Sequence, residues 1–328
     1  MNRGMFLVSL LALLFAGCAR KELLEQANDK LRAGSWFEAI ALYDKALSAR
    51  PGCAPALNNR GLAHEKNQDR QLAARDYELA IKADPAYFEA YNNLGALYVD
   101  MALYPKAVET LSKAISIKPD YALAYLNRGS AYYGMGVIPS ALDDFNRALA
   151  LDNGLPLAYY NRGMIFFALK NLPAALNDLN RAVELKRGFY AAYRMRGLVR
   201  QAGRDFDGAI EDFGKLTKLS PENFEGNYLR ARAMLSAGYT EGVLDDIVNA
   251  REHAPSSAAV LSLVGDYYAR VGNADHAMRA YAAAKKADPI NAAQYDAIIS
   301  ALKNNPSNPH ADEDIHSHQP GAEDTHTH

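Results

Sequence analysis

Residues 88–121 read FEAYNNLGALYVDMALYPKAVETLSKAISIKPDY, and the pattern of this 34-residue stretch recurs along the chain. Small residues hold its positions 8, 20 and 27, which are Gly95, Ala107 and Ala114, and nearly every other block repeats them. A fixed period of this length predicts a unit that stacks on copies of itself as a solenoid. Eight blocks follow one another without insertion: 20–53, 54–87, 88–121, 122–155, 156–189, 190–223, 224–257 and 258–291.

Each block predicts two helices that pack side by side. Small residues at positions 8, 20 and 27 let the two backbones approach, and large residues at positions 4, 11 and 24 fill the space beside them. Proline at position 32 ends the second helix, because it lacks an amide donor and restricts the residue before it. Asn153 and Arg187 replace this proline in the fourth and fifth blocks, so looser turns are expected there.

The pattern resembles the tetratricopeptide repeat (TPR) family. The resemblance rests on a large residue at position 4, Leu-Gly at 7 and 8, Tyr at 11, Ala at 20 and Pro at 32. It implies an all-α fold, a right-handed superhelical solenoid of eight TPR helix pairs. Residues 292–303 add one more amphipathic stretch, which predicts the capping helix that the end of such an array needs. The third block carries the pattern nearly throughout: Tyr91, Leu94, Gly95, Tyr98, Ala107, Leu111 and Pro119.

Residues 1–18 form a different kind of segment. Arg3 precedes an apolar run from Met5 to Ala16, which has the length of a signal peptide and is too short to span a bilayer. The run ends in Phe15-Ala16-Gly17-Cys18, which resembles the lipobox of bacterial lipoproteins, although Leu is usual where Phe15 stands. The resemblance implies acylation of Cys18 and, because Ala19 follows, an outer-membrane location facing the periplasm. An ordinary signal peptide or an uncleaved anchor is the alternative.

Residues 304–328 are rich in histidine and acid and contain neither Lys nor Arg. Low hydrophobicity with excess charge predicts a disordered tail. A solvated tail is one interpretation, and a metal-binding tract is the other, because histidine-rich tracts bind zinc or nickel. That alternative gives a metal-handling protein whose solenoid docks a partner. Its candidate ligands are His316, His318, His326 and His328.

Five blocks share an arginine at position 7 and an aspartate at position 23. The three blocks that lack the arginine also lack the aspartate: Gln26 with Leu42, Leu94 with Thr110, and Val264 with Ala280. This co-occurrence predicts ion pairs inside each block that fix the register of its two helices. The predicted pairs are Arg60–Asp76, Arg128–Asp144, Arg162–Asp178, Arg196–Asp212 and Arg230–Asp246.

The first helix of each block carries the candidate binding residues, since the TPR resemblance implies that this helix lines a concave groove. Position 6 is asparagine in four consecutive blocks, and an amide can match both halves of a peptide bond. The row resembles the asparagine ladder of TPR superhelices that bind extended polypeptides; otherwise asparagine is simply common at this position. Aromatic residues and two arginines follow on the same face. The candidates are Asn59, Asn93, Asn127, Asn161, Tyr133, Tyr160, Phe167, Arg194, Tyr228 and Arg232.

The sequence predicts no catalysis and no cofactor. The repeats, cap, leader and tail leave no stretch of the chain for a second domain, and the scattered histidines do not converge on one repeat position. A net charge of −2 without a basic stripe argues against nucleic acid as a partner. The expected function is a lipid-anchored scaffold that binds a protein or peptide of the cell envelope, and self-association of the solenoid is a further possibility.

Overall fold

The computed structural model describes residues 21–304, and all regular structure in that range is helical. Residues 21–32 form the first helix. The remaining helices are α2 (Trp36–Ala49), α3 (Ala54–Lys66), α4 (Arg70–Ala83), α5 (Phe88–Asp100), α6 (Tyr104–Ile117), α7 (Ala122–Gly134), α8 (Ile138–Leu151), α9 (Pro156–Ala168), α10 (Leu172–Leu185), α11 (Tyr190–Ala202), α12 (Phe206–Leu219), α13 (Phe224–Ala237), α14 (Val243–His253), α15 (Ala258–Arg270), α16 (Ala274–Ala287) and α17 (Ala292–Asn304). Odd-numbered helices from α3 to α15 therefore begin at the residues where the sequence blocks restart.

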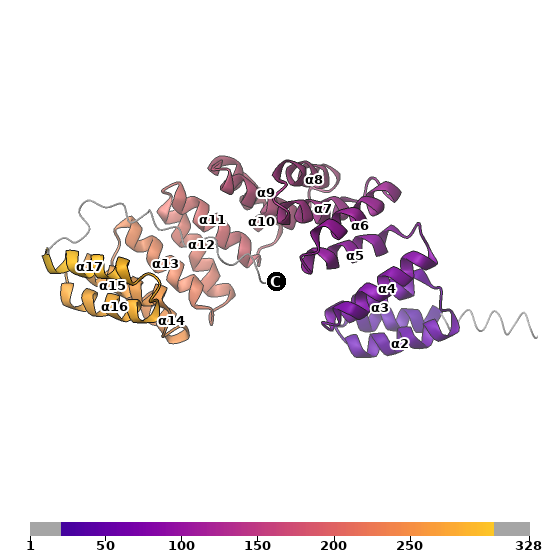
Figure 1. The fold of residues 1–328 in the computed structure, drawn as a ribbon, viewed down its shortest axis with the longest axis horizontal. Coiled ribbons are helices and arrows are strands. Elements are labelled where there is room, and N and C mark those ends of the chain that lie inside the picture. Colours follow the sequence, from indigo (N-terminus) through magenta and orange to yellow (C-terminus); the bar gives the residue numbers. More distant parts are fainter. Residues whose placement is uncertain (1–20, 305–328) are drawn as a thin grey trace, which may run out of the picture. The chain divides into compact units, whose positions relative to one another are not determined.

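Two compact units, divided between Ala158 and Tyr159, make up the chain. Within each unit the two helices of a repeat, here called A and B, pack against each other, as α5 does with α6 and α15 with α16 (Figure 1). Helix A also contacts helix A of the next repeat, as in α5–α7 and α13–α15, and no two B helices of the described part touch to the same degree. The A helices of a unit therefore line the inner side of its stack.

The core of each repeat is a small residue set against a large one. A β carbon added to Gly197 on α11 would lie 2.5 Å from Cε1 of Phe213 on α12, whose side chain is fully buried. A β carbon added to Gly265 on α15 would likewise lie 2.7 Å from Cε1 of Tyr281 on α16. Glycine at position 8 is therefore required by close approach of the B-helix ring, as the sequence pattern predicts.

The turn between the two helices of a repeat uses a left-handed backbone conformation at position 15. Glycine occupies this place in four repeats, while Gln68, Ala102, Lys170 and Arg204 adopt φ between 54° and 68° there. In the seventh repeat Gly238 and Gly242 are both left-handed, with φ of 90° and 74°. Helix α14 then starts only at Val243, three residues later than the B helices of the other repeats, which the constant sequence period does not predict.

The turn after the fifth repeat keeps the backbone hydrogen bond of the turns that contain proline, so the expected loosening is not found at Arg187. The Phe189 amide donates to the Lys186 carbonyl at 3.0 Å, and Tyr121 makes the same bond to Lys118 at 3.2 Å in a turn that contains proline. The backbone hydrogen bond, which does not depend on the proline ring, fixes the turn.

Helix α17 covers the exposed end of the last repeat. Its Tyr295 and Leu302 are buried in a cluster with Ala277, Tyr281 and Ala284 of α16. These contacts place α17 where a capping helix is expected, because they shield the apolar face that a further repeat would otherwise cover.

Candidate functional site

Arginine side chains on the A helices meet aspartates on the B helices in five repeats. In the second repeat Arg60 Nε donates to Asp76 Oδ2 at 2.7 Å and its Nη2 to Oδ1 at 2.6 Å. The same bidentate hydrogen bonding joins Arg128 to Asp144, with both N–O distances 2.8 Å. Arg162–Asp178, Arg196–Asp212 and Arg230–Asp246 complete the row.

The aspartate of each pair is almost inaccessible, with 1–7% of its side chain exposed. Hydrogen bonds to these carboxylates raise the pKa of Arg60, Arg128, Arg162 and Arg230, against the opposing effect of burial. Two parallel charge-assisted bonds fix the guanidinium plane, so each pair sets how helix A lies on helix B. These arginines have their charge satisfied inside the fold and are not available to an acidic ligand.

The third nitrogen of the guanidinium reaches the preceding repeat, which the sequence analysis missed. Arg60 Nη1 donates to Asp44 Oδ1 at 2.6 Å, Arg128 Nη1 to Ser112 Oγ at 3.0 Å, and Arg196 Nη1 to Asn180 Oδ1 at 2.9 Å. Each acceptor stands 16 residues before its arginine, and that constant separation was the available signal. The arginine row therefore ties neighbouring repeats together as well as the two helices of one repeat.

The asparagines at position 6 form a relay with other amides of the inner face. Asn127 Nδ2 donates to Asn92 Oδ1 and Asn93 Nδ2 to Asn58 Oδ1, both at 2.9 Å, and Asn59 Nδ2 donates to Asn28 Oδ1 at 3.0 Å. Bonds from Asn58 to Asn59 and from Asn92 to Asn93 link these steps. Asn58 and Asn92 are buried, while Asn59, Asn93, Asn127 and Asn161 are half-buried.

Each of Asn59, Asn93 and Asn127 spends one Nδ2–H on this internal relay. Asn59 is also hydrogen-bonded to the Tyr43 hydroxyl, whereas the second Nδ2–H of Asn93 and of Asn127 makes no further hydrogen bond within the described residues. An amide carries two donors and one acceptor, so one donor on each of Asn93 and Asn127 remains for a ligand on the inner face. The internal bonds hold the side chains in one orientation, which reduces the entropy that a ligand would otherwise lose in ordering them.

Aromatic side chains and arginines lie on the inner face of the second unit. Tyr160 and Phe167 on α9 pack against the cluster of Ala175, Leu179 and Val199, and the Tyr160 ring also lies 5.1 Å from that of Phe189. Tyr228 on α13 lies below the guanidinium of Arg232 at 5.6 Å. Tyr133, the remaining aromatic candidate, is half-buried on α7 in the first unit.

Arg194, a candidate binding residue from the sequence, is not a free cation in the structure. Its guanidinium is paired with Glu225 Oε1, and the Tyr190 hydroxyl donates to Oε2 of the same carboxylate at 3.1 Å. Burial, and then the charge of Glu225, raises the pKa of Tyr190, which keeps this hydroxyl a donor. Comparison of blocks within the sequence does not reveal this pairing, because Glu225 belongs to the next repeat.

Three TPR models match the chain, at residues 24–88 with 194–241, at 104–136 and at 156–189, and together they cover more than half of it. The chain belongs to the tetratricopeptide repeat family. A comparison with curated proteins gives no match.

Solved TPR structures share the fold. A chain of the APC/C hetero-tetramer Cut9-Hcn1 matches with a TM-score of 0.61 and 16% identity over 77% of this chain, which spans only 48% of that chain. PilF of Pseudomonas aeruginosa matches with a TM-score of 0.58 and 19% identity, over 65% of this chain and 97% of its own. A TPR protein of Parabacteroides merdae matches with a TM-score of 0.50 and 19% identity, over 75% of this chain and 97% of its own.

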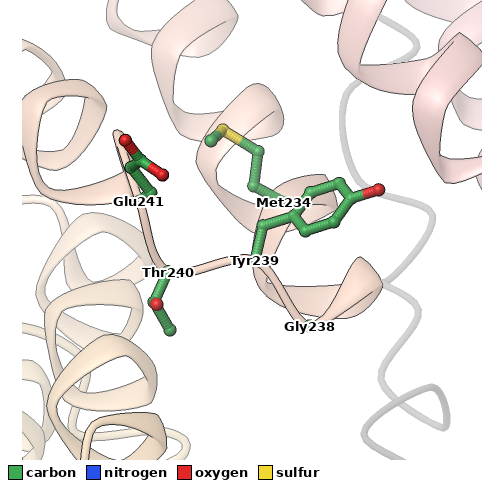
Figure 2. Close-up of a pocket in the computed structure, with 5 residues that line it drawn as sticks. All are labelled: Met234, Gly238, Tyr239, Thr240 and Glu241. Atoms are coloured by element: carbon green, nitrogen blue, oxygen red, sulfur yellow. The ribbon is translucent and has the colours of Figure 1, made fainter.

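Other features of this TPR protein do not add to the candidate binding site. A hollow at the turn between α13 and α14 is lined by Met234, Gly238, Tyr239, Thr240 and Glu241 (Figure 2). It includes none of the candidate residues, and Tyr239 is 47% exposed. Among residues 21–304, no group of three His, Cys, Asp or Glu side chains could hold a metal ion, and none of the helices has both the length and the apolar character needed to cross a bilayer.

Several sequence predictions lie outside the described residues. These are the leader 1–18 with its acylated Cys18, and the tail from 305 onward with the metal ligands His316, His318, His326 and His328. They remain predictions.

Proposed function

We propose that the chain is a non-catalytic scaffold that holds an extended segment of a protein partner along the inner face of its A helices. An acyl group on Cys18 tethers it to the outer membrane of a Gram-negative envelope, facing the periplasm. The tetratricopeptide repeat fold supports a role in protein interaction. The finer statements rest on the inner-face residues and on the leader sequence.

The observation that carries the proposal is the row of oriented amides. Asn93 and Asn127 each keep one donor, and the relay through Asn58, Asn59 and Asn92 holds them in place. Adjacent packed helices lie about 8–10 Å apart. An extended peptide advances about 3.3 Å per residue, so one amide meets every third residue of the ligand. Such spacing suits recognition of backbone carbonyls and leaves the side chains between them to vary.

Binding of this kind is modest in strength. A flexible peptide loses conformational entropy when it is ordered in an open groove, and only the surplus of contact energy appears as affinity. We expect a dissociation constant in the micromolar range, which corresponds to a binding free energy of about −8 kcal/mol.

A photo-crosslinking residue tests which face binds the partner. Benzoylphenylalanine at Ala96, on the inner face of α5, is expected to capture one protein in the cells that make this chain. The same residue at Glu109, exposed on α6, is the control and is expected to capture none. Capture from Glu109 alone, or from neither position, would contradict the proposal; a crosslink to a second copy of the chain would show self-association instead.

The same cells test the anchor. A Cys18→Ser chain is expected to leave the membrane fraction and to lose labelling by palmitate, while its purified body still binds the captured partner. Membrane retention with label in the Cys18→Ser chain would exclude Cys18 as the acylated residue.

A further inference from the structure

Arg232 is an inner-face arginine whose charge the second unit leaves unpaired. Arg194 is paired with Glu225, Arg196 and Arg200 with Asp212, and Arg230 with Asp246. Arg232 has no ion pair within residues 21–304, and its Nε is buried without a hydrogen-bond acceptor. A buried charged donor without an acceptor is unfavourable in the isolated protein, so a ligand that neutralises this guanidinium is favoured.

Carboxylates on the neighbouring elements are already engaged. Both oxygens of Glu225 accept hydrogen bonds, one from Arg194 and one from Tyr190. Asp266 Oδ1 on α15 accepts from the Tyr281 hydroxyl at 2.7 Å. Neither carboxylate forms an ion pair with Arg232 in the described structure.

The Tyr228 ring holds the guanidinium in place. The centre of the Arg232 guanidinium lies 5.6 Å from the ring centroid, and Tyr228 itself packs into the core cluster of Ala231, Val243, Ile247 and Leu263. A guanidinium that rests on an aromatic face keeps its hydrogen-bonding edge free for a ligand. The site is thus a fixed donor plane on an apolar floor.

We propose that Arg232 is a subsite for the side-chain carboxylate of an Asp or Glu in the bound peptide, a proposal that rests on the proposed function. A carboxylate matches both the planar donor edge and the single uncompensated charge. A phosphate would bring nearly two negative charges, and the nearby Arg194 and Arg230 are already neutralised by Glu225 and Asp246. Gln201 Oε1 on α11 is a second buried atom without a partner, and as an acceptor it suits a backbone N–H of the same peptide.

Selection from a random dodecapeptide library displayed on phage tests the subsite. The bait is the full chain in detergent, beside an Arg232→Gln chain and an Arg251→Gln chain. Arg251 is exposed on α14, so its replacement makes the same change in net charge away from the inner face. Circular dichroism and thermal melting confirm that all three are folded.

The wild-type and Arg251→Gln chains are expected to enrich peptides with an acid at one fixed place, and Arg232→Gln is expected to lose that preference. Replacing the acid of a selected peptide by its amide should weaken binding to wild type about tenfold and change binding to Arg232→Gln less than twofold. An acid preference that survives in Arg232→Gln overturns the subsite. Enrichment without any acid preference overturns it too but leaves the proposed groove standing, whereas failure to enrich any peptide counts against both.

The tail of this chain is a competing occupant, because it carries five acids and no Lys or Arg. A fourth bait has these acids replaced by their amides. If acidic peptides are enriched only on that bait, the occupant is the chain's own tail and the assignment to a separate partner is wrong. The replaced residues are Asp312, Glu313, Asp314, Glu323 and Asp324.

Discussion

Asp212→Ala is expected to destabilise the second unit by about 3–5 kcal/mol. The carboxylate is 1% exposed and accepts from two arginines, with Arg196 Nε and Arg200 Nη1 each 2.9 Å from Oδ2. Removing it leaves the Arg196 guanidinium at the A–B interface without a charge partner and takes the nearer of two carboxylates from Arg200. The loss therefore exceeds the value of a surface ion pair, which is at most about 1 kcal/mol.

Urea unfolding followed by circular dichroism measures this loss. Asp44→Ala is the matched control, because Asp44 also pairs with an arginine but has 55% of its side chain exposed. We expect the control to lie within about 1 kcal/mol of wild type. In a double-mutant cycle, Arg196→Met should recover part of the loss from Asp212→Ala, since the orphaned charge is then absent. Equal effects of Asp212→Ala and Asp44→Ala, or strict additivity, would show that the pair is not a buried structural contact.

Phe213→Ala is expected to cost about 3–5 kcal/mol, because it removes a fully buried ring and leaves a cavity beside Gly197. The ring fills the space that glycine at position 8 leaves open. Gly197→Ala alone should also destabilise the unit, since its new methyl group would lie 2.5 Å from Cε1 of Phe213.

The same Gly197→Ala change should be less harmful in the Phe213→Ala background, where space is available for the methyl group. Leu219→Ala on the same helix is the control, because Leu219 is 42% exposed and should change stability by less than about 0.5 kcal/mol. A small effect of Phe213→Ala would contradict the interlocked small–large packing on which the repeat depends.

Features confined to one repeat were readable from the sequence. The starts of the A helices from α3 to α15 follow from the constant period, and the arginine–aspartate contacts follow from the way Arg at position 7 and Asp at position 23 occur together. Both partners of each contact lie within one block, so comparing blocks within the chain reveals them. The place of α17 was readable as well, because its apolar residues fall on one helical face.

Features that depend on contacts between repeats could not be read in this way. The acceptor of the third arginine nitrogen changes from Asp44 to Ser112 to Asn180, so no residue type marks it. The pairing of Arg194 with Glu225 and the amide relay depend on side-chain rotamers across a repeat boundary. At position 15 the left-handed conformation belongs to the turn itself, since Ala102 adopts it without being glycine.

The central claim is that the oriented amides of the inner face bind the backbone of a partner. The most direct test is the dissociation constant of the crosslinked partner for a chain with Asn93→Ala and Asn127→Ala together, measured by calorimetry. A chain with Gln71→Ala and Asn249→Ala, two exposed amides on the B helices α4 and α14, serves as the control. Because the double variant loses two hydrogen bonds to the partner, we expect its dissociation constant to rise about tenfold or more. The dissociation constant of the control should not change. A constant within twofold of wild type, in a folded double variant, would contradict the account.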